Sequence, residues 1–154
     1  PIYGRSRFAW NAGLTAQVNF KCKWLGLRLG AMYGWSMAKY VDTANIFKHS
    51  LRYYQEGLTL PLSVVFQHNS DYGLFHAGIG FYYTRVFRGG VKNLKPSPSV
   101  RKDQVGLEWS LGYRFHGFDL SLYARYQFNY FTYDQSLPRL RIFSSGARLT
   151  WFFL

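Results

Sequence analysis

The stretch FAWNAGLTAQVNFKCKW, residues 8–24, decides the fold. Its even positions, from Phe8 and Trp10 to Cys22 and Trp24, are apolar, whereas its odd positions are mostly small or polar. Successive side chains of a strand point to opposite faces, so the stretch predicts a strand with one apolar and one polar face. The alternation also lasts longer than the five or six residues of an ordinary strand. Such length is typical of strands that cross a membrane.

The same alternation recurs six more times along the chain. We predict further strands over residues 27–37, 58–67, 74–84, 105–115, 118–130 and 143–153. Short connections at 25–26, 68–73 and 116–117 alternate with longer ones at 39–56, 85–104 and 131–140. Pro61 cannot donate to a ladder, so we expect a bulge or an unpaired position there.

This order of connections predicts an all-β, antiparallel, up-and-down transmembrane β-barrel that occupies residues 1–154 as one domain. Outer-membrane barrels have short periplasmic turns and longer extracellular loops, which predicts a bacterial outer-membrane location with the C-terminus in the periplasm. Seven strands are odd, whereas bacterial single-chain barrels have an even number. We therefore expect an eighth strand, either upstream of Pro1 or from another source.

Composition limits the other classes of protein. The 154 residues hold no run of 18 apolar residues, so no transmembrane helix is expected. Cys22 is the only cysteine, which excludes a disulfide within the chain and any zinc-ligand spacing. We expect its thiol on the apolar face near a strand end.

Alternation leaves two possibilities for the apolar face, because a soluble lipocalin-type barrel buries that face and an outer-membrane barrel exposes it. The polar faces are rich in glycine and carry few, concentrated charges, which suits a crowded interior. Aromatic residues gather towards both ends of the apolar faces, as interfacial girdles require. The predicted girdle comprises Trp24, Trp35, Tyr83, Phe115, Tyr130, Trp151 and Phe153.

The formal net charge of +12 divides unevenly between the ends and the interior of the predicted barrel. The loop side carries +9, the short-turn side balances Lys21 and Lys23 against Asp71 and Asp119, and the remaining +3 lies in the lumen. The basic extracellular loop comprises Arg85, Arg88, Lys92, Lys95, Arg101 and Lys102. A basic rim suits contact with the phosphates of lipopolysaccharide. Nucleic acid is not an expected partner, because the basic loops and the aromatic faces point in different directions.

Several stretches resemble the small PorT-like outer-membrane barrels of the Bacteroidota, an OmpA-like eight-stranded family. The stretch YQEGLTLPLSV at 54–64 resembles that family's Y-L-E-I-P-L-L-L strand, and GLEWSLGYRF at 106–115 resembles its G-L-x-x-G-L-G-Y-x-F strand. YARYQF at 123–128 and LTWFF at 149–153 resemble two later strands, whereas the family's opening strand has no counterpart. The resemblance implies an outer-membrane location and, for some members, work in secretion or nutrient-uptake assemblies.

The predicted luminal cluster comprises Arg28, His76, Glu108, Arg114, Arg125 and Arg148. Unpaired charge in a narrow lumen is costly, so we expect these groups to form salt bridges across it. No catalytic, cofactor or metal site is predicted.

The leading hypothesis for function is a structural or accessory subunit of an outer-membrane assembly for secretion, uptake or biogenesis, with lipid and partner proteins as its contacts. Two alternatives stay open. One is a lipid A-modifying enzyme that uses Glu108 and His76, with Ser110 on the same face. The other is a narrow anion-preferring channel along the luminal arginines.

Overall fold

The computed structural model describes residues 4–40, 51–92, 99–129 and 143–151. The described residues form seven strands and no helix. The strands are β1 (Gly4–Asn19), β2 (Leu25–Tyr40), β3 (Leu51–Ser70), β4 (Gly73–Lys92), β5 (Asp103–Phe115), β6 (Phe118–Gln127) and β7 (Phe143–Trp151).

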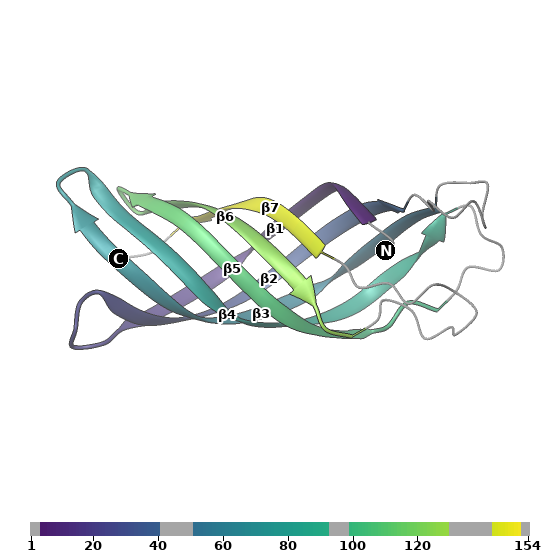
Figure 1. Cartoon of the computed structure of the whole chain (residues 1–154), viewed down its shortest axis with the longest axis horizontal. Coiled ribbons are helices and arrows are strands. Elements are labelled where there is room, and N and C mark those ends of the chain that lie inside the picture. Colours follow the sequence, from purple (N-terminus) through teal and green to yellow (C-terminus); the bar gives the residue numbers. More distant parts are fainter. Residues whose placement is uncertain (1–3, 41–50, 93–98, 130–142, 152–154) are drawn as a thin grey trace.

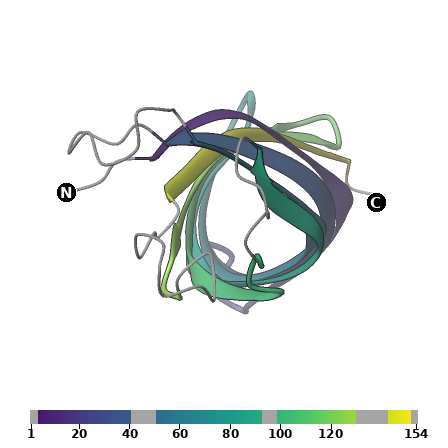
Figure 2. The same ribbon diagram turned by 90° about the vertical axis from the view of Figure 1, so that its right-hand side faces the viewer.

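The strands follow one another in a single antiparallel sheet of order β1 to β7 (Figure 1). The sheet curls around an axis until β1 and β7 lie side by side, with Cα atoms within 8 Å of each other (Figure 2). Every consecutive pair is antiparallel, so the first and seventh strands run in the same direction. Within the described ranges, no ladder joins these two strands. The fold is therefore a barrel-like sheet with a seam between β1 and β7.

The first strand is shorter than predicted, and residues 20–24 form a turn. Phe20 N donates to Leu25 O at 2.9 Å, and Leu25 N donates to Cys22 O at 2.9 Å. The predicted connection at Leu25 and Gly26 was wrong, because both residues already pair with β3. Alternation of side chains alone does not reveal where the backbone reverses. Cys22 is exposed in this turn.

Two predicted long loops are partly strand. The β2–β3 ladder continues to Tyr40 opposite Leu51, and the β3–β4 ladder continues to Lys92 opposite Arg52. A register shift at Glu56 and Gly57, opposite Arg88 and Val86, interrupts the regular alternation there. A bulge of this kind inserts a residue and shifts which side chains face inward, so the sequence pattern fails while backbone pairing continues.

Two local predictions are confirmed. The β2–β3 ladder passes from Leu29 opposite Leu62 to Met32 opposite Thr59, so Pro61 lies at a break in the ladder. The turn at His116 and Gly117 has φ values of 43° and 84°. Positive φ at both central residues defines the tight hairpin turn that matches strand twist.

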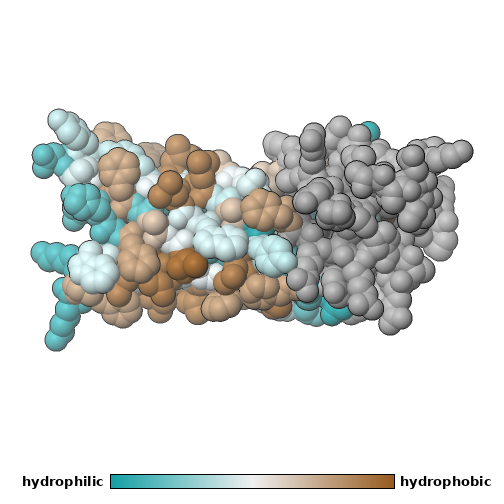
Figure 3. Space-filling view, in the orientation of Figure 1, coloured by the Kyte–Doolittle hydropathy of each residue, from teal (hydrophilic) through white to brown (hydrophobic). Residues whose placement is uncertain are grey.

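Polar and apolar side chains divide between the two faces of the sheet as predicted, with the polar face inside the curl. Arg125 and Arg148 are 7% and 4% exposed inside the curl, whereas Leu14 and Leu122 are 73% and 64% exposed outside it. Figure 3 shows apolar side chains over the visible wall and hydrophilic ones gathered at the end that carries the short turns. The described residues include no helix long and apolar enough to cross a membrane.

Candidate functional site in the lumen

The six predicted luminal residues all lie inside the curl, but they form two separate clusters. One lies midway along the wall and contains Glu108, Arg125 and Arg148. The other lies nearer the short turns and contains Arg28, His76 and Arg114 around Asp119. In the following, we call them the Glu108 cluster and the Asp119 cluster.

Cross-strand register positions the Glu108 cluster. Glu108 on β5 lies directly opposite Arg125 on β6, and Arg148 comes from β7 beyond it. Arg125 Nε donates to Glu108 Oε2 at 2.6 Å, while Arg148 Nη2 donates to both carboxylate oxygens at 3.0 Å. Glu108 is 2% exposed. Because it accepts from two arginines, this buried carboxylate has the compensation that burial of charge demands.

Two tyrosines pack on the same arginines. The guanidinium of Arg125 lies 5.3 Å from the ring centre of Tyr82 and 4.7 Å from that of Tyr123. Arg148 lies 5.1 Å from the Tyr123 ring. Tyr123 Oη also accepts from Asn11 Nδ2 at 2.5 Å. Cation–π contacts are strongest away from water, so the two tyrosine rings fill space in the lumen and stabilise the buried arginines.

Asp119 is the luminal group that sequence reasoning missed. The charge balance predicts Asp119 on the short-turn side, whereas in the structure it is 1% exposed inside the curl. Its Oδ2 lies 2.7 Å from His76 Nε2, 3.5 Å from Arg114 Nε and 3.6 Å from Arg28 Nη2. The inward alternation of the strand was the signal that could have found it.

Gln17 completes the Asp119 cluster from β1. Its Oε1 accepts from Arg28 Nη2 at 2.9 Å and from Arg114 Nη2 at 3.3 Å. Gly112 makes room for the histidine, since a Cβ added there would lie 2.5 Å from His76 Cε1 and Nε2. The glycines of the polar faces therefore provide space for large luminal side chains.

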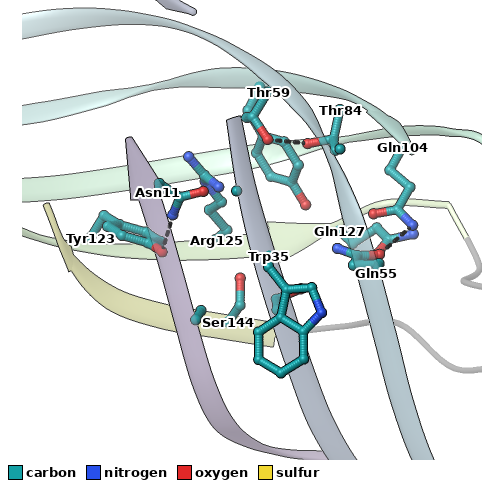
Figure 4. Close-up of a pocket in the computed structure, with 15 residues that line it drawn as sticks. Asn11, Trp35, Gln55, Thr59, Thr84, Gln104, Tyr123, Arg125, Gln127 and Ser144 are labelled. Atoms are coloured by element: carbon teal, nitrogen blue, oxygen red, sulfur yellow. Dashed lines mark hydrogen bonds between the residues drawn. The ribbon is translucent and has the colours of Figure 1, made fainter. Parts of the chain in front are cut away.

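A small polar cavity of about 40 Å³ lies beside Arg125 (Figure 4). Thr59 and Thr84 are hydrogen-bonded to each other on its wall at 2.8 Å, and Gln104 Nε2 donates to Gln55 Oε1 at 2.8 Å. The remaining lining residues are Ala9, Asn11, Gly34, Trp35, Ser36, Gly57, Tyr82, Tyr123, Gln127 and Ser144. Sequence reasoning did not single out this ring of glutamines and threonines, because such residues are also common on exposed strand faces.

The predicted basic loop residues lie partly on strands. Arg85, Arg88 and Lys92 belong to β4, Arg101 and Lys102 immediately precede β5, and Lys95 lies outside the described residues. Arg85, Arg88 and Lys92 are exposed. The prediction of a loop over 85–92 was wrong, because these residues continue the ladder with β3.

One ion pair marks the loop end of the wall. Tyr83 Oη and Arg85 Nη1 both donate to Asp103 Oδ1 at 2.5 Å. Asp103 is the first residue of β5 and precedes its apolar face. The tyrosine hydrogen bond first, and then the arginine, hold the pKa of Asp103 below its usual range.

Most of the predicted girdle is exposed on the outer wall. Trp24, Tyr83, Phe115 and Trp151 are exposed, and Trp35 is half-buried. Trp35 also borders the polar cavity. Tyr130 and Phe153 lie outside the described residues.

The structure places Glu108 and His76, which the enzyme hypothesis combines, in different clusters. Glu108 is held by two arginines, whereas His76 contacts Asp119 in the other cluster. Among the residues the structure places, no group of three or more His, Cys, Asp or Glu side chains could hold a metal ion. Among the described residues, the two clusters contain four arginines and two carboxylates, a formal charge of +2 with neutral histidine.

No family model, no curated protein and no solved structure matches this chain. The resemblance to PorT-like barrels stays a prediction.

Proposed function

We propose that this chain spans a bacterial outer membrane as a β-barrel and serves as a structural or accessory subunit of an outer-membrane assembly. The observation that supports the membrane location is the inverted distribution of polarity. Large apolar side chains point outward from every strand, including Leu14 on β1, Leu29 on β2 and Leu149 on β7. Soluble monomers seldom expose apolar patches beyond a few hundred Å². Acyl chains would cover this surface.

The loop end supports contact with anionic headgroups. Exposed Arg88 and Lys92 on β4 and Lys102 before β5 lie at that end of the sheet. A cluster of cations at the membrane surface attracts lipid phosphates, including those of lipopolysaccharide. The predicted orientation, with short turns and C-terminus in the periplasm, would place these residues on the outside of the cell.

The seam supports the accessory role. The described parts of β1 and β7 are sheet edges, and edges offer backbone groups that pair readily with another strand. Because β1 and β7 are parallel, one additional strand antiparallel to both would complete an eight-stranded antiparallel barrel. Cα atoms of β1 and β7 now lie within 8 Å of each other, so the two strands would have to separate to about twice the 4.7–4.9 Å spacing of paired strands to admit it. We propose that the seam is where this chain meets its partner.

Fluorescence quenching tests the membrane location. Single cysteines at Leu122 and Tyr72, in a Cys22→Ser background, would carry a fluorophore in phosphatidylcholine vesicles. Both sites are exposed, at 64% on the wall and 82% in a short turn. We expect brominated acyl chains to quench the label at 122 and aqueous iodide to quench the label at 72. Iodide quenching of both labels to the same extent would contradict a lipid-facing wall.

Photo-crosslinking in native membranes tests the accessory role. A photoreactive residue at Leu14, beside the seam, should yield a discrete protein adduct. The same residue at Phe81 on β4, which is 63% exposed on the wall formed by the central strands, should yield lipid adducts alone. Absence of any protein adduct from position 14 would remove the seam as a partner site while leaving the membrane location intact.

A further inference from the structure

Four basic residues occupy one cross-strand row at the loop end of strands β1 to β4. The ladders pair Arg5 with Lys39, Lys39 with Arg52, and Arg52 with Lys92. Paired strands lie about 4.7–4.9 Å apart, so the four register positions span about 14 Å. In the following, we call them the basic row.

The side chains of Arg52 and Lys92 lie on the outer face. Both residues are exposed, whereas Tyr53 and Val91, next to them in sequence and opposite each other in the ladder, are each 4% exposed inside the curl. Because successive side chains of a strand point to opposite faces, Arg52 and Lys92 point outward. The row is therefore accessible from outside the barrel.

The basic row is unfavourable without a counter-charge. Like charges directly opposite each other on neighbouring strands destabilise a sheet, and the row contains three such pairs. Glu56 is the one carboxylate on strands β1 to β4, and it accepts from Tyr33. Within the described ranges, no salt bridge reaches Arg52 or Lys92. This arrangement favours an anionic ligand.

Aromatic residues follow the row towards the apolar wall. Lys92 Nζ lies 5.8 Å from the ring centre of Tyr54, two residues after Arg52 on β3. Further along, Trp10 lies opposite Trp35, and the Trp10 ring lies 6.1 Å from that of Tyr33. Tryptophan and tyrosine gather at the headgroup level of a membrane. Cations beyond aromatics are the order expected where a membrane-spanning wall leaves the bilayer.

The height of the row selects the kind of headgroup. Lys39 lies four residues beyond Trp35 on β2, about 13 Å along the strand at roughly 3.3 Å per residue. With a strand tilt of about 40°, this distance corresponds to roughly 10 Å along the membrane normal. A phospholipid phosphate lies at the level of the aromatics, whereas a headgroup extended by acidic or phosphorylated sugars reaches the row.

The row also defines how the ligand is held. Divalent cations need oxygen ligands, usually carboxylates, and the row offers only cations. We propose that Arg52 and Lys92 bind the anionic saccharide headgroup of an outer-leaflet glycolipid of the lipopolysaccharide class directly, without a bridging divalent cation. This inference rests on the proposed membrane location and assigns the headgroup contact to one row of residues.

Native mass spectrometry of the full chain in detergent micelles tests the assignment. The probe is deep-rough lipopolysaccharide, which carries phosphates and acidic sugars, titrated in the presence of EDTA to remove divalent cations. We expect the chain to bind it several-fold more tightly than phosphatidylglycerol, whose phosphate lies beside its acyl chains. Release of the glycolipid by EDTA would exclude direct binding, and equal affinity for the two lipids would exclude recognition of the saccharide.

Two double variants with the same change of charge locate the site. Arg52→Gln with Lys92→Gln should weaken glycolipid binding about 20- to 30-fold, because each cation near a membrane surface contributes about fivefold. Lys21→Gln with Lys23→Gln removes the same charge from the exposed turn between β1 and β2 and should leave the affinity unchanged. Equal affinities in the two double variants would show that net charge alone matters and would overturn the site.

Quenching of the label at position 122 separates this inference from the membrane location. The measurement is repeated in the wild-type background and in both double variants. If the membrane location is wrong, iodide quenches the label in all three proteins. If only the present inference is wrong, brominated acyl chains still quench the label and the two double variants bind the glycolipid equally.

Discussion

The β3–β4 hairpin and the β1–β7 seam differ most, within this one sheet, in how much backbone pairing joins their strands. The hairpin has the longest ladder, from Arg52 opposite Lys92 to Ser70 opposite Gly73, with one register shift. The seam has no ladder between the described residues of its two strands. Backbone hydrogen bonds along the ladder stabilise the hairpin, whereas side chains that cross the lumen stabilise the seam.

The side chains that stabilise the seam come from strands further round the curl. Asn11 on β1 bonds Tyr123 on β6, and Gln17 on β1 bonds Arg114 on β5. Gly146 on the intervening β7 permits the first contact, because a Cβ there would lie 2.7 Å from Tyr123 Oη. Hairpin partners are close in sequence, whereas joining the ends of the chain carries a larger loop-closure entropy. Polar side chains in the lumen thus stabilise the closure of the sheet at the seam, which backbone pairing between neighbours in sequence does not.

The largest loss of stability is expected from a substitution in the Glu108 cluster, which links β7 to β5 through Arg148. Glu108→Gln leaves two buried arginines without their counter-ion and should lower the free energy of unfolding by about 3–5 kcal/mol. Glu56→Gln is the matched control, because Glu56 accepts from Tyr33 on the outer wall and should cost about 0–1 kcal/mol. Denaturant unfolding in detergent micelles measures the free energy of unfolding of both variants. Equal losses would show that the lumen contributes no more than the surface.

A smaller loss is expected in the hairpin. A Cβ at Gly80 would lie 2.0 Å from Leu62 O, a backbone atom that cannot move without disturbing the ladder. Gly80→Ala should therefore cost about 1–3 kcal/mol. Gly89→Ala, whose Cβ would meet its nearest atoms at 3.2 Å, should cost less. The same unfolding assay applies, and an unaffected Gly80→Ala variant would contradict the close backbone approach.

The smallest effect is expected from the hydrogen bond that reaches across the seam. Asn11→Ala and Tyr123→Phe should each lower the free energy of unfolding by about 0.5–1.5 kcal/mol, since each removes the bond between Asn11 Nδ2 and Tyr123 Oη. The double variant should lose less than the sum of the two. Strict additivity in this double-mutant cycle would indicate that the two residues do not interact across the seam.

Much of the luminal site could be predicted from the sequence. The period of two in a strand assigned Arg28, His76, Glu108 and Arg148 to the interior, and the structure places them there. The pairing among them could not be predicted, because it depends on register and on the curl of the sheet. His76 therefore contacts Asp119 rather than Glu108, and the cavity beside Arg125 had no signature in the sequence.

Strand number, the inward and outward faces and the turn at His116–Gly117 follow from the order of residues, because side-chain alternation and turn chemistry are local properties. Strand ends, the Asp119 cluster and the parallel seam were decided by tertiary structure alone. Backbone ladders run on past the point where alternation fails, as between Arg52 and Lys92. Groups distant in sequence, such as Gln17 and Arg114, meet only when the sheet curls and brings its first strand against its last.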